Sequence, residues 1–299
     1  MNRWLCPPEG EADVVLDTDA YNEVDDQFAI AYLLQSVPKL RTKAIYAAPF
    51  WNERSSSPED GMEKSYEEIY RLLKLMGRDE VPVFRGSTRY LPSETEAVIS
   101  PAAEDLGTRA MHYSPEWPLY VVAIGAITNI ASALLLYPQI KDRIVVVWLG
   151  GHALSYQDNY EFNLYQDIAA ARIVFGCGVP LVQLPCQGVV GAFTLSREDL
   201  KNWFCGTKLG EYLSGNTLEL MDQRGFGPYA SKVIWDVTAV AWLLDREGHM
   251  MDSRLIPSPI PEYDHHWGFS SRRHLIRYVT MIHKNELMED LVKKLNQPV

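Results

Sequence analysis

An acidic segment near the N-terminus crowds five carboxylates into one short stretch, and such crowding is typical of a cation-binding site. The five residues are Asp17, Asp19, Glu23, Asp25 and Asp26. Carboxylates this close together repel one another unless a cation or shared protons offset their charge. Oxygen-rich clusters of this kind are the ligands that hard divalent cations such as calcium prefer. The segment therefore predicts a metal-binding site.

A helix N-terminus is a second interpretation of the same segment. Asp25 and Asp26 directly precede an apolar helical pattern, where carboxylates suit the free backbone amides and the helix dipole. This interpretation does not account for Asp17 and Asp19, which follow the apolar run 14–16. The spacing lacks the alternating acidic positions, central Gly and late Glu of an EF-hand. The segment also contains no GxGxxG and no P-loop lysine, so it does not indicate a dinucleotide or nucleoside triphosphate site.

Short apolar runs alternate with helical patterns along the chain. Strands are expected at residues 14–16, 43–48, 81–84, 119–124, 144–149 and 179–184, and helices at 27–35, 65–76, 128–136, 167–175 and 237–244. This order predicts an α/β fold, a mostly parallel open sheet with helices on both faces. We expect a single domain over residues 1–299, in which 54–61 is a polar loop rather than a boundary.

Polar or glycine-bearing turns follow several of these strands. They are the acidic turn after Leu16, the turn around Asn52, the turn 125–129 and the pair Gly150 and Gly151. Open α/β sheets place their ligands at the carboxyl ends of the strands. We therefore expect these four turns to converge on one site.

The composition restricts the class of partner. The chain has 299 residues, of which 47% are hydrophobic, and its formal net charge is -11. A protein this acidic is not expected to bind a nucleic-acid backbone. No apolar run approaches the roughly 18 residues of a membrane span, so no membrane partner is expected. Residues 1–8 carry no apolar leader, and no two of the four cysteines form a CxxC pair, which together predict a cytoplasmic protein with reduced, buried thiols.

Two histidines lie beside carboxylates near the C-terminus, at His265 and His266 in the run from Glu262 to Trp267. They can be read as a second metal cluster, or as an acid near a leaving group. Nothing else at metal-ligand spacing accompanies them. A surface or hinge pair is the favoured interpretation.

Four segments, in order, resemble the motifs of the nucleoside hydrolase family. The acidic segment 17–29 resembles its DxD-turn-DD signature, 125–131 its G-x-[LI]-T-N-[IL]-A, 149–151 with 161–167 its M-G-G … E-F-N-x-x-x-D, and Trp235-Asp236 its late [HW]-D-x-x-A. The matches span roughly residues 13–245. The resemblance implies a nucleoside hydrolase-like fold with a Rossmann-like core, and cleavage of the N-glycosidic bond of ribonucleosides.

The same resemblance implies roles for particular residues. One Ca²⁺ would be held by Asp19, Asp26, the backbone carbonyl of Thr128, and Asp236, with Asp19 also acting as the general base for the attacking water. The ribose hydroxyls would be held by Asp25, Glu161 and Asn163, with weaker matches at Asn52 and Asn22. Family members are commonly homodimers or homotetramers, which is the assembly that the resemblance implies here.

Trp235 stands where many family members have a histidine. This resembles the purine-preferring branch, in which a tryptophan at this place stacks on the base. A buried core aromatic is the alternative interpretation. Tyr90, Trp51 and Tyr229 are candidates for a second stacking partner.

The acidic turn departs from the common motif, because two extra residues lie between Asp19 and Asp25 and Glu23 has no clear counterpart. The segment between Gly151 and Glu161 is also short, and Asn159 is a candidate for its usual Asn.

Three hypotheses follow from the sequence. The first is hydrolysis of a ribonucleoside to the free base and ribose, with a purine slightly favoured. The second keeps the reaction but changes the substrate to a modified or non-nucleoside N-ribosyl compound. The third is a calcium-bearing, ribosyl-binding protein without catalysis. The presence of Asp19, Asp25, Asp26 and Asp236 together favours the first two over the third.

Overall fold

A computed structural model describes residues 5–297 of the chain. Residues 1–4, part of the N-terminal stretch in which no apolar leader was expected, lie outside the described range. The central sheet has eight strands in the order β3-β2-β1-β4-β5-β6-β12-β9. Neighbouring strands are parallel except for β12 and β9, which pair antiparallel at one edge. The prediction of an α/β fold on a mostly parallel open sheet is therefore confirmed.

The strands of this sheet are short and largely apolar. They are β1 (Ala12–Thr18), β2 (Leu40–Ala47), β3 (Val83–Arg85), β4 (Leu119–Ala123), β5 (Ile144–Leu149), β6 (Leu181–Leu184), β9 (Met251–Pro257) and β12 (Leu275–Ile282). Every residue of β4, β5 and β6 is buried. Strands that are apolar on both faces need helices on both sides of the sheet.

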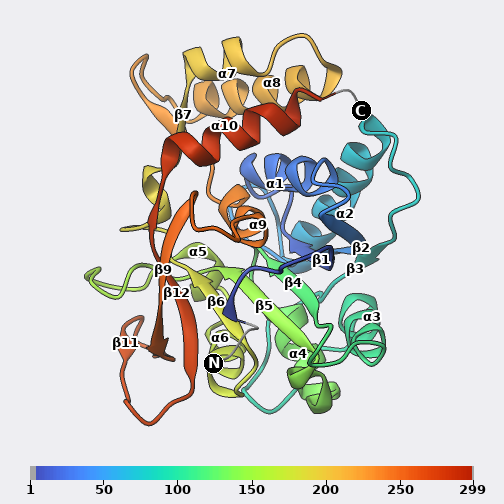
Figure 1. Cartoon of the computed structure of the whole chain (residues 1–299), viewed down its shortest axis with the longest axis vertical. Helices are drawn as coiled ribbons and strands as arrows, with labels where there is room; N and C mark the ends of the chain where they lie inside the picture. Colours follow the sequence, from blue (N-terminus) through green and yellow to red (C-terminus); the bar gives the residue numbers. More distant parts are fainter. Residues whose placement is uncertain (1–4, 298–299) are drawn as a thin grey trace.

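Two layers of helices supply that cover (Figure 1). One layer holds α1 (Asp25–Leu34), α2 (Pro58–Leu75), α9 (Val237–Leu244) and α10 (Lys284–Leu295). The other holds α3 (Pro101–Ala110), α4 (Thr128–Leu136) and α6 (Ile168–Gly176). Each layer forms its own hydrophobic core against one face of the sheet.

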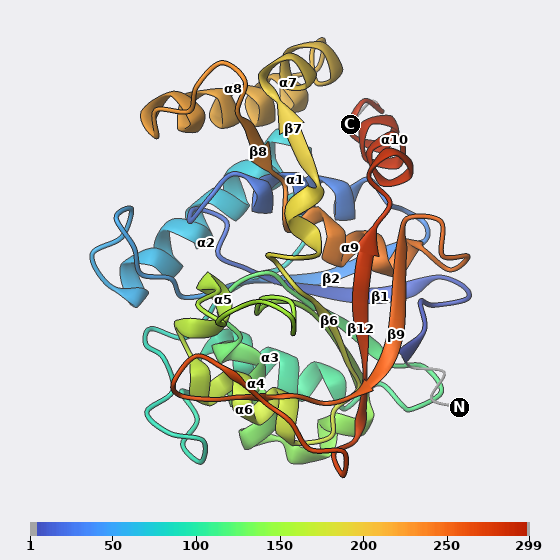
Figure 2. The ribbon, with the colours of Figure 1, turned by 90° about the vertical axis from the view of Figure 1, so that its left-hand side faces the viewer.

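Smaller elements extend from this core. They are α5 (Phe162–Tyr165), α7 (Arg197–Trp203), α8 (Lys208–Gln223), the 3-10 helices η2 (Pro138–Asp142) and η3 (Val190–Ala192), and the two-stranded pairs β7 (Thr194–Ser196) with β8 (Ser231–Val233) and β10 (Ile260–Pro261) with β11 (Trp267–Gly268). Figure 2 shows α7, α8, β7 and β8 together at one end of the molecule. Within the described residues, no helix is both long and apolar enough to cross a membrane.

The expected elements agree closely with the observed ones, and one expectation is wrong. The bounds of α4, β5 and α9 are those predicted from the sequence. The polar stretch 54–61, expected to be a loop, instead contains the first turn of α2. The Ser57 side chain accepts a hydrogen bond from the Asp60 backbone N–H, and Pro58 occupies the first helical position. Serine and proline in these two places favour a helix start, which the polarity of the stretch concealed.

Adjacent strand ends bring the polar turns together. The backbone N–H of Ala48, after β2, donates to the Thr18 carbonyl at the end of β1, and Ile124, after β4, donates to the Asp17 carbonyl. The parallel register therefore places the acidic turn between the turns that follow β2 and β4, as predicted.

Candidate active site

A cavity of about 380 Å³ opens at the carboxyl ends of the central strands. Nine of the ten residues predicted to form a site line it: Asp19, Asn22, Asp25, Asp26, Asn52, Glu161, Asn163, Trp235 and Asp236. The tenth, Thr128, is buried at the first position of α4, and its hydroxyl donates to Asp167 Oδ2 at 2.7 Å. Residues from both ends of the sequence thus meet in one small polar cavity.

Asp19 is the least satisfied polar side chain of this cavity. It is 1% exposed, and neither of its carboxylate oxygens has a hydrogen-bond partner. Burial raises its pKa well above the usual range, and the charge of Asp26 raises it further. A Cβ at position 125 would lie 3.0 Å from the Ala48 Cβ and 3.2 Å from the Asp19 carboxyl carbon, so a larger residue at this turn would crowd Asp19. A buried carboxylate without partners is costly unless something binds it.

Asp26 and Asp236 are also buried beside Asp19, although they are far apart in the sequence. The Thr18 hydroxyl donates to Asp26 Oδ1 at 2.5 Å, and the charge of Asp26 helps to raise the pKa of Asp236. Burial and the charge of Asp25 raise the pKa of Asp26 to about 7 and that of Asp236 well above its usual range. Like charges held this close favour a proton or a cation between them.

The chemistry of these donors fits calcium. Asp19 presents two free, hard oxygen atoms, and the carboxylates of Asp26 and Asp236 adjoin it in a buried acidic cluster. Within residues 5–297, however, no group of three or more His, Cys, Asp or Glu side chains has the geometry to hold a metal ion. The fit therefore rests on the type and burial of the oxygen donors.

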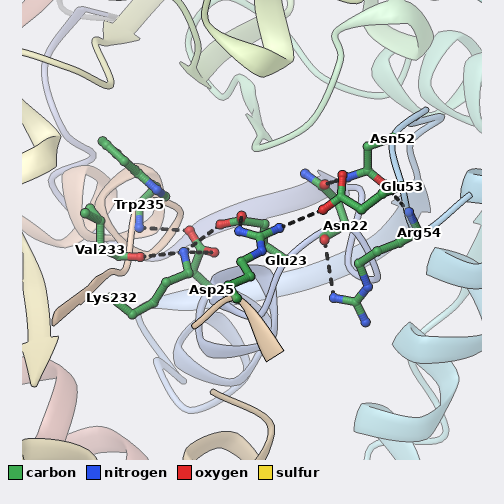
Figure 3. Close-up of polar contacts among 10 residues, drawn as sticks. Asn22, Glu23, Asp25, Asn52, Glu53, Arg54, Lys232, Val233 and Trp235 are labelled. Atoms are coloured by element: carbon green, nitrogen blue, oxygen red, sulfur yellow. Dashed lines mark hydrogen bonds and ion pairs between the residues drawn. The ribbon is translucent and has the colours of Figure 1, made fainter. Parts of the chain in front are cut away.

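Asp25 is held by the segment that contains β8. Its Oδ2 accepts from the backbone N–H of Trp235 at 2.9 Å, and its Oδ1 lies 3.2 Å from the ammonium of Lys232. Figure 3 shows these contacts, together with the one between Lys232 and Glu23. Lys232 was not predicted from the sequence, because its partners are more than 200 residues away.

Glu161 and Asn163 face the cavity from the N-terminus of α5. The Glu161 carboxylate accepts three backbone N–H groups, from Gly151 at 2.8 Å and from Asn163 and Leu164 at 3.0 Å. Burial raises its pKa, and these hydrogen bonds offset only part of that effect. The Asn163 amide donates to the carbonyls of Ile124 and Leu149, at the ends of β4 and β5. Both side chains are therefore oriented by backbone before any ligand binds.

Asn22 and Asn52 also line the cavity, and they contact each other. The Asn52 amide nitrogen donates to Asn22 Oδ1 at 2.6 Å, and Asn52 Oδ1 accepts the Arg54 backbone N–H. Asn22 is itself fixed by a 2.7 Å hydrogen bond from its backbone N–H to the Asp19 carbonyl. The two amides can exchange this mutual contact for hydroxyl groups of a ligand.

Asn129 is a supporting residue that the motif contained but to which no role was assigned. Its amide nitrogen donates to Asp17 Oδ1 at 2.7 Å and to the Ala47 carbonyl at 3.3 Å. Its oxygen accepts from the backbone N–H and the hydroxyl of Ser87. This buried side chain thus joins the ends of β1 and β2 to the turn after β3, and it holds the acidic turn in place.

The other lining residues were not predicted. They include His152, Tyr160, Phe162, Tyr165, Cys186, Gln187 and Arg224. Burial raises the pKa of the Cys186 thiol well above its usual range, and the charge of Glu161 raises it further, so this thiol stays protonated. Burial lowers the pKa of His152, which keeps its imidazole neutral.

None of the three candidates for a second stacking aromatic, Tyr90, Trp51 and Tyr229, lines the cavity, and Tyr229 is 99% exposed. Tyr160 does line it, and its ring stacks on the imidazole of His265 at a centroid distance of 3.9 Å. His265 thus supports an aromatic wall of the cavity, a role that its sequence context did not indicate.

Two further expectations concern neighbouring residues. Asn159 is buried, and its Oδ1 accepts the His152 backbone N–H at 2.7 Å, so it orders the loop before Glu161 without lining the cavity. All four cysteines are free, but the expectation of buried thiols holds only for Cys186, because Cys6 and Cys177 are partly exposed and Cys205 is exposed.

The parallel sheet and its cavity define an α/β protein with an acidic, amide-lined site for a small ligand. The sequence matches the family described as inosine-uridine preferring nucleoside hydrolase over residues 14–281. The chain belongs to this family, and it is a nucleoside hydrolase.

Known proteins agree with this assignment. The pyrimidine-specific ribonucleoside hydrolase RihA of Citrobacter koseri is 29% identical over 255 residues, 75% of this chain and 77% of that protein. A solved plant nucleoside hydrolase has a TM-score of 0.76 at 18% identity, covering 96% of this chain and 99% of its own. A purine-preferring ribonucleoside hydrolase from Gardnerella vaginalis has a TM-score of 0.73 at 20% identity, covering 95% and 98%. The two structures share the fold of this chain.

Proposed function

We propose that this nucleoside hydrolase is calcium-dependent and that Asp19 is its general base. The observation that carries the proposal is the pair of buried, unpartnered oxygens on Asp19, in a cavity shared with Asp26 and Asp236. A base that removes a proton from water must reach that water directly, and these oxygens are free to do so. The water oxygen then bonds to the anomeric carbon while the N-glycosidic bond breaks, and the nucleobase leaves with the bonding electrons and takes up a proton, so that water is divided between the ribose and the free nucleobase.

Asp19, Asp26, Asp236 and the Thr128 carbonyl are the proposed calcium ligands. The three carboxylates are buried together, which supports a shared cation. When bound, calcium supplies positive charge that offsets these carboxylates and lowers the pKa of an attacking water. The Thr128 carbonyl enters the proposal by resemblance, since its side chain is directed to Asp167.

Asp25, Glu161 and Asn163 are the proposed ribose-binding residues, and Asn22 and Asn52 are proposed to assist them from elsewhere in the cavity lining. Departure of the base leaves positive charge on the sugar, in an oxocarbenium-like transition state. Carboxylates and amide oxygens that are already oriented stabilise such charge without further reorganisation. The backbone hydrogen bonds to Glu161 and Asn163 give this preorganisation.

A purine is the proposed leaving base, because Trp235 lines the cavity and its large aromatic ring suits stacking on a purine. The second candidate is a pyrimidine, since the RihA relatives are named pyrimidine-specific. A modified N-riboside is a third possibility, which the longer acidic turn supports. A homodimer or homotetramer, proposed by resemblance alone, is tested by light scattering.

Replacing Trp235 with alanine is expected to raise the KM for a purine nucleoside by about 5- to 150-fold, the equivalent of 1–3 kcal/mol for base stacking on an aromatic side chain. The matched variant W235F keeps a ring and should retain most of the binding. Equal KM values in W235A and the unaltered protein would show that Trp235 is only a core aromatic.

The substrate is tested with a panel of inosine, adenosine and uridine, followed by the release of reducing sugar. We expect turnover of at least one of them, fastest for a purine. Faster turnover of uridine would favour the pyrimidine candidate. Turnover of none would contradict the hydrolysis of standard nucleosides and direct the search to modified N-ribosides.

A further inference from the structure

Lys232 is a buried cation that none of the proposed roles uses. It is 4% exposed, and its ammonium contacts Glu23 Oε2 at 2.6 Å, Asp25 Oδ1 at 3.2 Å and the Val233 carbonyl at 2.9 Å. An ammonium group has three protons to donate, so all three are used. Burial lowers its pKa, but the charges of Asp25 and Glu23 more than offset this and raise it to about 12.

Lys232 and Trp235 each contact one oxygen of the Asp25 carboxylate. Lys232 contacts Oδ1, and the backbone N–H of Trp235 donates to Oδ2. Figure 3 shows each of these donors in contact with Asp25. A carboxylate has about four acceptor positions, so two contacts fix its plane and leave positions open for ligand hydroxyls.

Glu23 is the second anchor of Lys232. Its other oxygen pairs with Arg224, which also contacts Glu53 at 3.2 Å, and all three residues line the cavity. Burial raises the pKa of Glu23, but Lys232 and Arg224 together lower it below its usual value. Glu23 belongs to the lengthened part of the acidic turn, so the added residues have a structural consequence in this chain.

We propose that Lys232 is a positioning residue for the reaction, which fixes the Asp25 carboxylate toward the ribose while Glu23 holds Lys232 in place. The inference rests on the proposed function of Asp25 as a ribose-binding residue. It assigns the lengthened acidic turn a role, namely to supply the carboxylate that completes the anchoring of Lys232. A small displacement of a substrate-binding group is enough to slow an enzyme, because reacting atoms must be closely aligned.

The test is the K232M variant, with the 2′-deoxy and 3′-deoxy forms of the best ribonucleoside as competitive inhibitors. Inhibition constants are measured, so the deoxy compounds need not be turned over. K232M should raise the KM of the ribonucleoside by at least about tenfold, since it removes one partner of a buried charge pair. The inhibition constant of whichever deoxy compound lacks the hydroxyl bound by Asp25 should stay nearly unchanged.

Two further variants keep the test decisive. E23Q removes the second anchor but leaves Lys232 beside Asp25. It should therefore raise the same KM and leave the same inhibition constant unchanged, with a smaller effect than K232M. This variant provides the test if K232M does not fold. K294M removes a partly buried lysine that pairs with Asp290 on α10, away from the cavity, and should leave KM and the inhibition constants unchanged.

The outcomes separate the two claims. Absence of turnover in the unaltered protein would overturn the proposed function. Suppose that the unaltered protein is active. If K232M or E23Q then weakens the binding of the ribonucleoside and of both deoxy compounds equally, the positioning role is overturned, because a general structural defect weakens binding whether or not a compound carries the hydroxyl. An unchanged KM in both variants would overturn it as well.

Discussion

Asp19→Asn is expected to lower kcat by at least about a thousandfold, within the range that a general base contributes and with the loss of a metal ligand added. The side chain keeps its size but loses its charge, and an amide nitrogen replaces one of the two free oxygens. The folded protein should not lose stability, because burial already raises the pKa of Asp19 and its neighbours repel its charge. Initial rates of nucleoside hydrolysis measure the effect.

Asp60→Asn is the matched control for this variant. Asp60 is an aspartate at the start of α2 that pairs with Lys64 and does not line the cavity. It should keep the activity of the unaltered protein. A D19N variant that retains full kcat would remove Asp19 from the role of base.

Glu161→Ala is expected to have the second-largest effect, on both stability and activity. Three backbone N–H groups, from Gly151, Asn163 and Leu164, would lose their acceptor in a buried place. Leaving buried donors unpaired costs about 1–3 kcal/mol each, so unfolding should become easier by at least about 2 kcal/mol. Hydrolysis should fall at least about a hundredfold, because the loop that holds Asn163 loses its support and the ribose loses a ligand.

Denaturant unfolding and initial rates separate the two parts of this effect. E161Q, which keeps one acceptor oxygen, should recover much of the stability but not the activity. An E161A protein with unchanged stability would contradict the role of the carboxylate as the cap of α5.

Much of this site was predictable, because its parts are local. The acidic turn follows a buried strand directly, and the motifs at 125–131, 149–151 and 161–167 each mark a strand end or a helix start. Parallel strands carry such turns to one edge of the sheet, so their convergence follows from topology alone. The placement of Asp19 beside Asp236, more than 200 residues later, came from the resemblance and not from any local pattern.

The remainder depends on contacts between distant segments. Lys232 gives no signal on its own in the sequence, and its role is visible only where β8 meets the acidic turn. Tyr160 was not predicted because its loop has no periodic pattern. His265 was interpreted from the residues next to it in the sequence, which do not include the Tyr160 ring on which it stacks. In the same way, Ser57 and Pro58 were read as loop residues although together they begin α2.

The most direct test of the account is the rate of ribonucleoside hydrolysis before and after divalent cations are removed with a chelator, followed by the addition of calcium. We predict that the chelated protein falls to the activity of D19N and that calcium restores it. The D26N and D236N variants should need much more calcium for the same recovery. Full activity in the chelated protein would contradict a calcium site formed by Asp19, Asp26 and Asp236.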